Sequence, residues 1–199
     1  MTVRDDYRAA VEWYVGVVDA AAAADPALGG AGLGEWSRRE LVAHTARSLS
    51  TVVDYTTPAD GSAIDVEDAA GYYAIVLRAD PAEVAARARA AAEAAGDDVV
   101  GHVHRLAEAA VATVASAPVD ADAVTPFARM TLDAYLPTRT LELVVHGLDL
   151  TPVAEVPSAL LAPVLATLSA IAVTTGRGVD AVRALAGRDG ARVGLFDPL

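Results

Sequence analysis

The chain has 199 residues, of which 54% are hydrophobic, and this length fits one domain with a full buried core. Its formal net charge of -12 argues against nucleic acids and anionic membrane surfaces as partners. There is no cysteine, which excludes disulfides, thiolate zinc sites and a cysteine nucleophile. Any bound metal ion must therefore take nitrogen and oxygen ligands.

Alanine supplies much of the hydrophobic content and aromatic residues only 5% of the chain, which predicts an all-α fold. The N-terminus lacks a charged segment followed by an apolar core, and no uncharged run is long enough to cross a bilayer. We find no repeat and no domain linker, so we expect a single domain over residues 1–199. Because neither a signal peptide nor a membrane span is predicted, we expect this domain in the cytoplasm. The Lys-poor usage, rich in Ala, Asp, Arg and Gly, is typical of a high-GC bacterial gene.

Two long helices are predicted in the first 57 residues. Thr2 can cap the first helix, which should end at Asp25 before a proline. Ser37 and Glu40 have the spacing of a capping box at the start of the second. His44 lies at one border of the buried face of this second helix, on a line with Tyr55. A lone histidine in such a place is more often a satisfied core residue than a metal ligand.

Three further helices are expected next, with starts at Asp65 or Asp68, at Asp80-Pro81, and at Asp97 or Asp98. The last of them should run to about Ser116 and contains His102 and His104. These two side chains point in nearly opposite directions on a helix, so the pair cannot chelate one ion. Residues 118–135 read as an irregular connection, with a short extended piece at 130–132.

The segment from Arg139 to Leu150 follows Pro137, a residue favoured in the first turn of a helix. On a helix, one narrow polar stripe collects four side chains: Arg139, Glu142, His146 and Asp149. Glu142 and His146 are one turn apart, so a carboxylate and an imidazole can face a single ion. The alternative is a solvated strip on an amphipathic helix.

Two helices are expected after residue 157, over about 158–174 and 179–186, the second closed by Gly187. The first of them has a weak polar face, which indicates either deep burial or a contact between copies of the chain. A homodimer is therefore one of the partners that we consider.

The second helix and the 139–150 helix are readily neighbours in an antiparallel bundle. His44, Glu142 and His146 would then form a facial set of ligands that leaves positions open for water or substrate. Asp149 can accept the second ring N–H of a metal-bound histidine, and Arg139 can also act from outside the ligand set.

Three motifs resemble the mycothiol-dependent maleylpyruvate isomerase N-terminal family, which belongs to the DinB-like metal-binding four-helix bundles. The family's first pattern, W-[ST]-x-x-[DE]-L-V-x-H, is matched by Trp36-Ser-Arg-Arg-Glu-Leu-Val-Ala-His44. The second, R-x-x-E-x-x-x-H-x-x-D-L, is matched by Arg139-Thr-Leu-Glu142-Leu-Val-Val-His146-Gly-Leu-Asp149-Leu150. The closing A-L-x-G-R is similar to Ala184-Leu-Ala-Gly-Arg188. The motifs occur in the family's order, so the resemblance covers most of the chain.

This resemblance implies an up-down four-helix bundle with additional short helices and a divalent ion, typically zinc, held by His44, Glu142 and His146. It also implies that the ion activates mycothiol, a low-molecular-weight thiol, for isomerisation of or conjugation to an electrophilic substrate. Arg139 or Tyr55 would orient that second substrate. The full maleylpyruvate isomerase carries a further C-terminal domain, and we expect none here.

Two other functions remain open at the level of sequence. One is a metal-dependent hydrolase in which the open position activates water. The other is a non-catalytic bundle that binds a metal ion or a small molecule.

Overall fold

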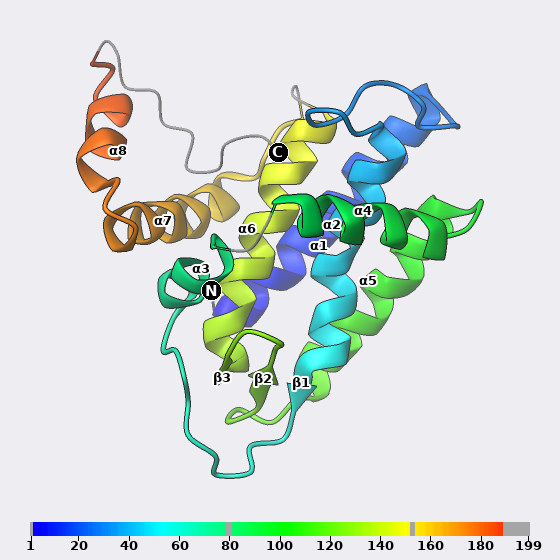
Figure 1. Cartoon of the computed structure of the whole chain (residues 1–199). Helices are drawn as coiled ribbons and strands as arrows, with labels where there is room; N and C mark the ends of the chain where they lie inside the picture. Colours follow the sequence, from blue (N-terminus) through cyan, green and yellow to red (C-terminus); the bar gives the residue numbers. More distant parts are fainter. Residues whose placement is uncertain (1, 79–80, 152–153, 189–199) are drawn as a thin grey trace.

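The computed structural model describes residues 2–78, 81–151 and 154–188, and Figure 1 shows its mainly helical architecture. The elements in chain order are α1 (Val3–Ala24), α2 (Arg38–Tyr55), β1 (Thr56–Thr57), α3 (Ala69–Val76), α4 (Pro81–Ala94), α5 (Val99–Ser116), β2 (Asp122–Val124), β3 (Arg129–Thr131), α6 (Leu132–Leu150), α7 (Ser158–Thr174) and α8 (Gly178–Leu185).

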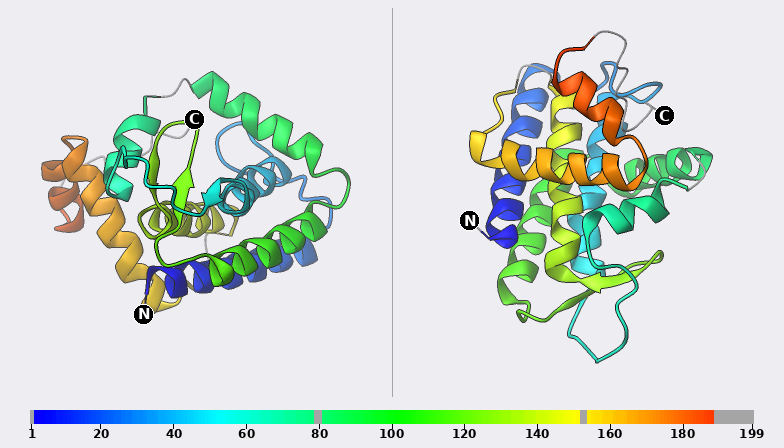
Figure 2. Two further views of the ribbon diagram at one scale, coloured as in Figure 1. Left: turned by 90° about the horizontal axis from the view of Figure 1, so that it is seen from below. Right: turned by 90° about the vertical axis from the view of Figure 1, so that its left-hand side faces the viewer.

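Four long helices, α1, α2, α5 and α6, pack side by side around one core (Figure 2). The strands form an antiparallel sheet in the order β1-β2-β3 at one end of the bundle. Because α2 and α5 lead into this sheet while α6 leaves it, α2 and α6 run antiparallel. The helices α3 and α4 lie in the long connection between α2 and α5. The predicted all-α, DinB-like bundle with additional short helices is confirmed.

The helix starts follow the predicted caps. The Thr2 and Ser37 side chains each accept a hydrogen bond from the backbone three residues on, and both form complete capping boxes. Asp68 and Asp98 cap α3 and α5 in the same way. Asp80, the cap expected for α4, lies outside the described residues. The caps therefore fix where α2 begins, and with it the position of His44 two turns later.

The irregular connection predicted over residues 118–135 is wrong in part, because Asp122–Val124 is the strand β2 and α6 begins before residue 135. The short extended piece predicted at 130–132 is confirmed for its first two residues, which belong to β3. Arg129–Thr131 is a strand that pairs with β2, and α6 already begins at Leu132, capped by the Thr131 side chain. Pro137 lies inside α6 rather than before it. Its missing N–H costs a single hydrogen bond, to the carbonyl of Asp133, and the packing of α6 on α1 and α2 outweighs that loss.

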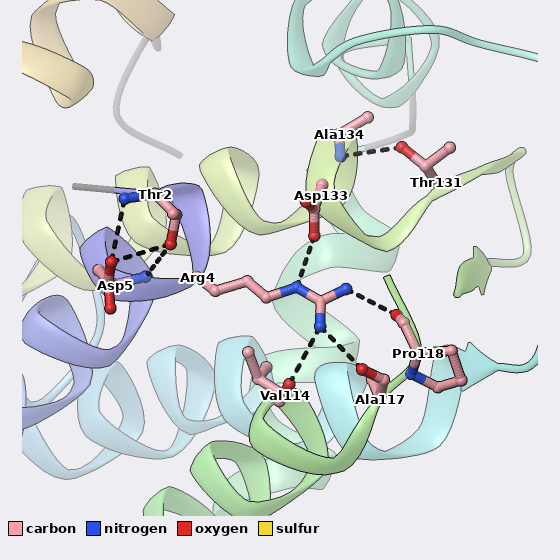
Figure 3. A network of polar contacts seen from close by, with 9 residues as sticks. All are labelled: Thr2, Arg4, Asp5, Val114, Ala117, Pro118, Thr131, Asp133 and Ala134. Atoms are coloured by element: carbon pink, nitrogen blue, oxygen red, sulfur yellow. Dashed lines mark hydrogen bonds and ion pairs between the residues drawn. The ribbon is translucent and has the colours of Figure 1, made fainter. Parts of the chain in front are cut away.

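A half-buried arginine joins three helices at the end of the bundle where the sheet lies (Figure 3). Arg4 of α1 donates from Nε to Asp133 Oδ1 at the start of α6, over 2.8 Å. Its Nη atoms donate to the carbonyl oxygens of Val114, Ala117 and Pro118 at the end of α5. The bonds to Val114 and Ala117 satisfy carbonyls at the end of α5 that have no partner in their own helix. They fix the relative height of α1, α5 and α6.

The helix α7 lies across the outside of the bundle, against α3 and α6, and it also contacts α8 (Figure 1). Of the two predictions for this helix, deep burial is wrong, because the side chains of Leu161 and Leu165 are 40% and 48% exposed. A contact between copies of the chain through this helix remains a prediction. Within the described residues, none of the helices combines the length and the apolar character needed to cross a membrane.

Candidate metal centre

The structure brings His44 of α2 together with Glu142 and His146 of α6. One ligand atom from each residue lies within 4.8 Å of the others, and the two imidazole ring centroids are 5.3 Å apart. The side chains of His146 and Glu142 are 14% and 22% exposed, so they line a sheltered place that solvent still reaches. The convergence predicted from two distant segments is thus present.

His44 is held as a neutral imidazole. Its ring packs 4.7 Å from the ring of Trp36, which immediately precedes the helix cap. Its Nδ1 is buried and has no hydrogen-bond partner among the described residues. Burial, together with the charge of His146, lowers the pKa of His44 to about 4. The ring therefore keeps its lone pair available at neutral pH, and a buried nitrogen without a hydrogen-bond partner fits a residue that binds an ion.

His146 is fixed from both sides by carboxylates. Its Nδ1 lies 3.0 Å from Asp149 Oδ2, and its Nε2 lies 3.2 Å from Glu142 Oε2. Burial alone would lower the pKa of His146, but the hydrogen bonds to Asp149 and Glu142 raise it to about 9. Asp149 therefore has the position expected of a residue that orients a metal-binding histidine. That role for Asp149 remains a prediction.

Glu142 lies among hydrogen-bond donors and positive charge. Burial would raise the pKa of its carboxyl, but the hydrogen bond from His146 and the charges of His146 and Arg139 hold it well below the usual range. The Tyr73 hydroxyl donates to Glu142 Oε1 over 2.5 Å. Nothing in the sequence singled out Tyr73, because the short helix α3 has no motif and no polar periodicity that points to α6.

Arg139 lies one turn before Glu142 on α6. Its Cζ is 5.0 Å from the centroid of the Tyr135 ring, and its Nε donates to Thr138 Oγ1 over 2.9 Å. Burial would lower the pKa of its guanidinium, but the phenol rings of Tyr135 and Tyr73 and the carboxylate of Glu142 raise it. Arg139 is therefore a fixed cation beside the candidate centre.

Tyr55 lies away from the three converging residues. It ends α2, eleven residues after His44, which is about 16 Å along the helix axis. Its ring is 6.4 Å from that of Tyr135, and no hydrogen bond or ring contact joins it to the candidate ligands among the described residues. A part for Tyr55 in orienting a substrate remains a prediction, and Arg139 is the better placed of the two.

The other two histidines lie on α5 and belong to different surroundings. His104 Nε2 lies 2.8 Å from Asp19 Oδ1 on the surface. His102 is half-buried on the same helix. Neither is part of a group of possible metal ligands among the residues that the structure describes.

The converging donors fit a divalent ion. Ligand atoms bound to zinc at about 2.1 Å in a tetrahedral arrangement lie about 3.4 Å from one another. The ligand atoms of the three residues lie within 4.8 Å of one another, so small side-chain rotations suffice to bring them to that separation. Two imidazoles and one carboxylate form a donor set that proteins use for zinc with an exchangeable position. The unpartnered His44 nitrogen agrees with that assignment.

Zinc binding is expected to weaken with acid because His146 must lose its proton to accept the ion. With a pKa of about 9 in the metal-free protein, His146 is protonated at neutral pH, whereas His44 is not. The apparent affinity should fall about tenfold for each pH unit from roughly pH 8 to 6. Competition with a chelator at constant ionic strength measures this slope.

The control for this pH dependence is Asp149→Asn, since the hydrogen bond to Asp149 helps to raise the pKa of His146. The variant should keep its affinity constant down to a lower pH than the unchanged protein. A zinc affinity that does not vary with pH over this range would contradict the charge assignment.

A comparison with family models finds that residues 7–151 match the mycothiol maleylpyruvate isomerase N-terminal domain. The comparisons with curated proteins and with solved structures gave no significant match. The match covers most of the chain and includes all of α1 to α6 except the first four residues of α1. His44, Glu142 and His146 lie within it. The chain thus belongs to the mycothiol maleylpyruvate isomerase N-terminal domain family.

Proposed function

We propose that this protein binds a divalent ion, preferably zinc, through His44, Glu142 and His146 and uses this ion to bind mycothiol. The reaction is transfer of the thiol to an electrophilic small molecule, or an isomerisation that begins with attack by the thiol. The observation that carries this proposal is the convergence of two imidazoles and a carboxylate at a sheltered, solvent-accessible place. Membership of a mycothiol-related family supports the thiol as the co-substrate.

A bound ion would lower the pKa of a thiol in contact with it and so supply the nucleophile at neutral pH. The chain itself has no cysteine, so the nucleophilic sulfur must come from an added molecule. The protein's own residues hold the donors in place. Asp149 orients the His146 ring through Nδ1, and Trp36 packs against His44.

Arg139 is the residue that we assign to the second substrate. Its cation lies one turn from Glu142 and is held by the Tyr135 ring and Thr138. Arg139 donates hydrogen bonds in a planar fork and so fixes the orientation of an electrophile that carries an anionic or carbonyl oxygen. This arrangement provides the alignment that a bimolecular attack by a thiol needs.

Formation of a thiol conjugate tests the proposal. Zinc-loaded protein, mycothiol and a chromogenic aryl halide should give the thioether and halide at a rate well above that of the mixture without protein. His146→Ala should abolish this increase, whereas His104→Ala, which removes a surface contact with Asp19, should keep it. Turnover that survives in His146→Ala would contradict the role of the centre.

Ester substrates distinguish the main alternative, because the same donor set also occurs in zinc hydrolases. Hydrolysis of an activated ester without any added thiol, lost in His146→Ala, would favour a metal-dependent hydrolase. A folded protein that binds no metal ion would favour a non-catalytic bundle.

A further inference from the structure

The two oxygens of Glu142 face different partners. Oε1 accepts the hydroxyl hydrogen of Tyr73 over 2.5 Å. Oε2 lies 3.2 Å from His146 Nε2. The carboxylate therefore presents one oxygen to the candidate ion and has the other occupied by a phenol. At neutral pH a tyrosine hydroxyl is protonated and donates to the carboxylate.

Tyr73 is held firmly enough to keep this contact. Its side chain is 2% exposed, and its hydroxyl is also 3.4 Å from the carbonyl oxygen of Thr138. Its ring meets that of Tyr72 edge to face at 6.2 Å. The helix that carries it, α3, is capped by Asp68 and packs on both α6 and α7. The hydroxyl group that contacts Glu142 thus comes from α3, a helix outside the four-helix core.

We propose that Tyr73 is a positioning residue that restricts Glu142 to coordination through Oε2 alone and so keeps one position of the ion open for a guest sulfur. The occupation of Oε1 follows from the contacts of this chain, whereas the identity of the guest rests on the proposed function. Coordination by both carboxylate oxygens would give four protein donors, so that water or a guest sulfur would have to bind as a fifth ligand. With one oxygen, three protein donors remain and the fourth position is free.

Tyr73→Phe tests this inference, with Tyr72→Phe as the matched control on the same helix. Each change removes one hydroxyl and keeps the aromatic ring, and thermal unfolding establishes that both variants fold. Cobalt(II) in the unchanged protein and in Tyr72→Phe should show the strong visible bands of four-coordinate cobalt. In Tyr73→Phe these bands should weaken towards the five-coordinate pattern because Glu142 binds through both oxygens. This readout needs no thiol and no turnover.

A titration with mycothiol adds the functional consequence. Thiol affinity of the zinc-loaded protein should fall about tenfold in Tyr73→Phe and stay unchanged in Tyr72→Phe, as loss of an outer hydrogen-bond partner predicts. X-ray absorption of the unchanged zinc protein should show one carboxylate oxygen and not two.

The outcomes separate the two proposals. If cobalt spectra change as expected but no thiol binds to any form, the positioning role stands and the thiol function fails. If the Tyr73→Phe spectrum equals that of the unchanged protein, or the unchanged protein already has a two-oxygen carboxylate, the positioning role is overturned whether or not thiol binds. Failure of the unchanged protein to bind cobalt or zinc overturns both.

Discussion

Replacing His44 by alanine is expected to weaken zinc binding by at least about a hundredfold, more than loss of an outer hydrogen-bond partner usually costs. The variant removes the one ligand that α2 supplies and leaves the two on α6, which cannot enclose an ion alone. The change breaks no hydrogen bond of His44 Nδ1 to a described residue, but it removes the packing of the ring on Trp36 and should also lower the stability of the protein.

The remaining histidines of the chain provide the controls for this experiment. His102→Ala and His104→Ala lie on α5 and should keep the zinc affinity of the unchanged protein. Chelator competition gives the affinities, and far-UV circular dichroism checks that each variant keeps its helices. Equal losses for His44→Ala and His102→Ala, or no loss for His44→Ala, would remove the candidate centre from the place where we put it.

Replacing Gly147 by leucine is expected to destabilise the protein by about 3 kcal/mol. A Cβ at this position would lie 2.5 Å from Cζ3 of Trp13, where α1 packs against α6. The Trp13 ring cannot easily turn aside, because its Nε1 donates to the carbonyl oxygen of Glu155 over 2.8 Å. The close approach of the two helices next to His146 therefore depends on the absence of a side chain at Gly147.

The matched control is Gly16→Leu, at an exposed glycine within α1 where an added Cβ would meet no described atom within 4 Å. There the better helix propensity of leucine should stabilise the protein by up to about 1 kcal/mol. Denaturant unfolding of the three proteins gives the comparison. A Gly147→Leu protein as stable as the unchanged one would mean that α1 and α6 do not approach as closely as described.

The sequence predicts those parts of the fold that local chemistry determines. The caps at Thr2 and Ser37 depend on hydrogen bonds within four residues, and both occur as expected. The polar stripe on α6 depends only on helical periodicity, and it places Glu142 and His146 on one face. The expected antiparallel packing of two helices, supported by the family motifs, then predicts that His44 completes the set.

Features that depend on contacts between distant segments could not be read in this way. Pro137 looked like a helix start, but tertiary packing carries α6 through it from Leu132. Tyr73 reaches Glu142 only because the α2–α5 connection folds α3 against α6, and no local pattern records that contact. Tyr55 and His44 lie on the same side of α2, as helical periodicity predicts, but they are eleven residues apart along the helix, which keeps their side chains apart.

X-ray absorption at the zinc edge, recorded before and after mycothiol is added to the zinc-loaded protein, tests the central claim most directly. We predict two imidazole nitrogens and one carboxylate oxygen at first, and one additional sulfur at about 2.3 Å after the thiol is added. Because the chain has no cysteine, a thiolate sulfur at that distance can come only from the added molecule. A spectrum without bound imidazole, or one in which no sulfur appears at saturating thiol, would contradict the account.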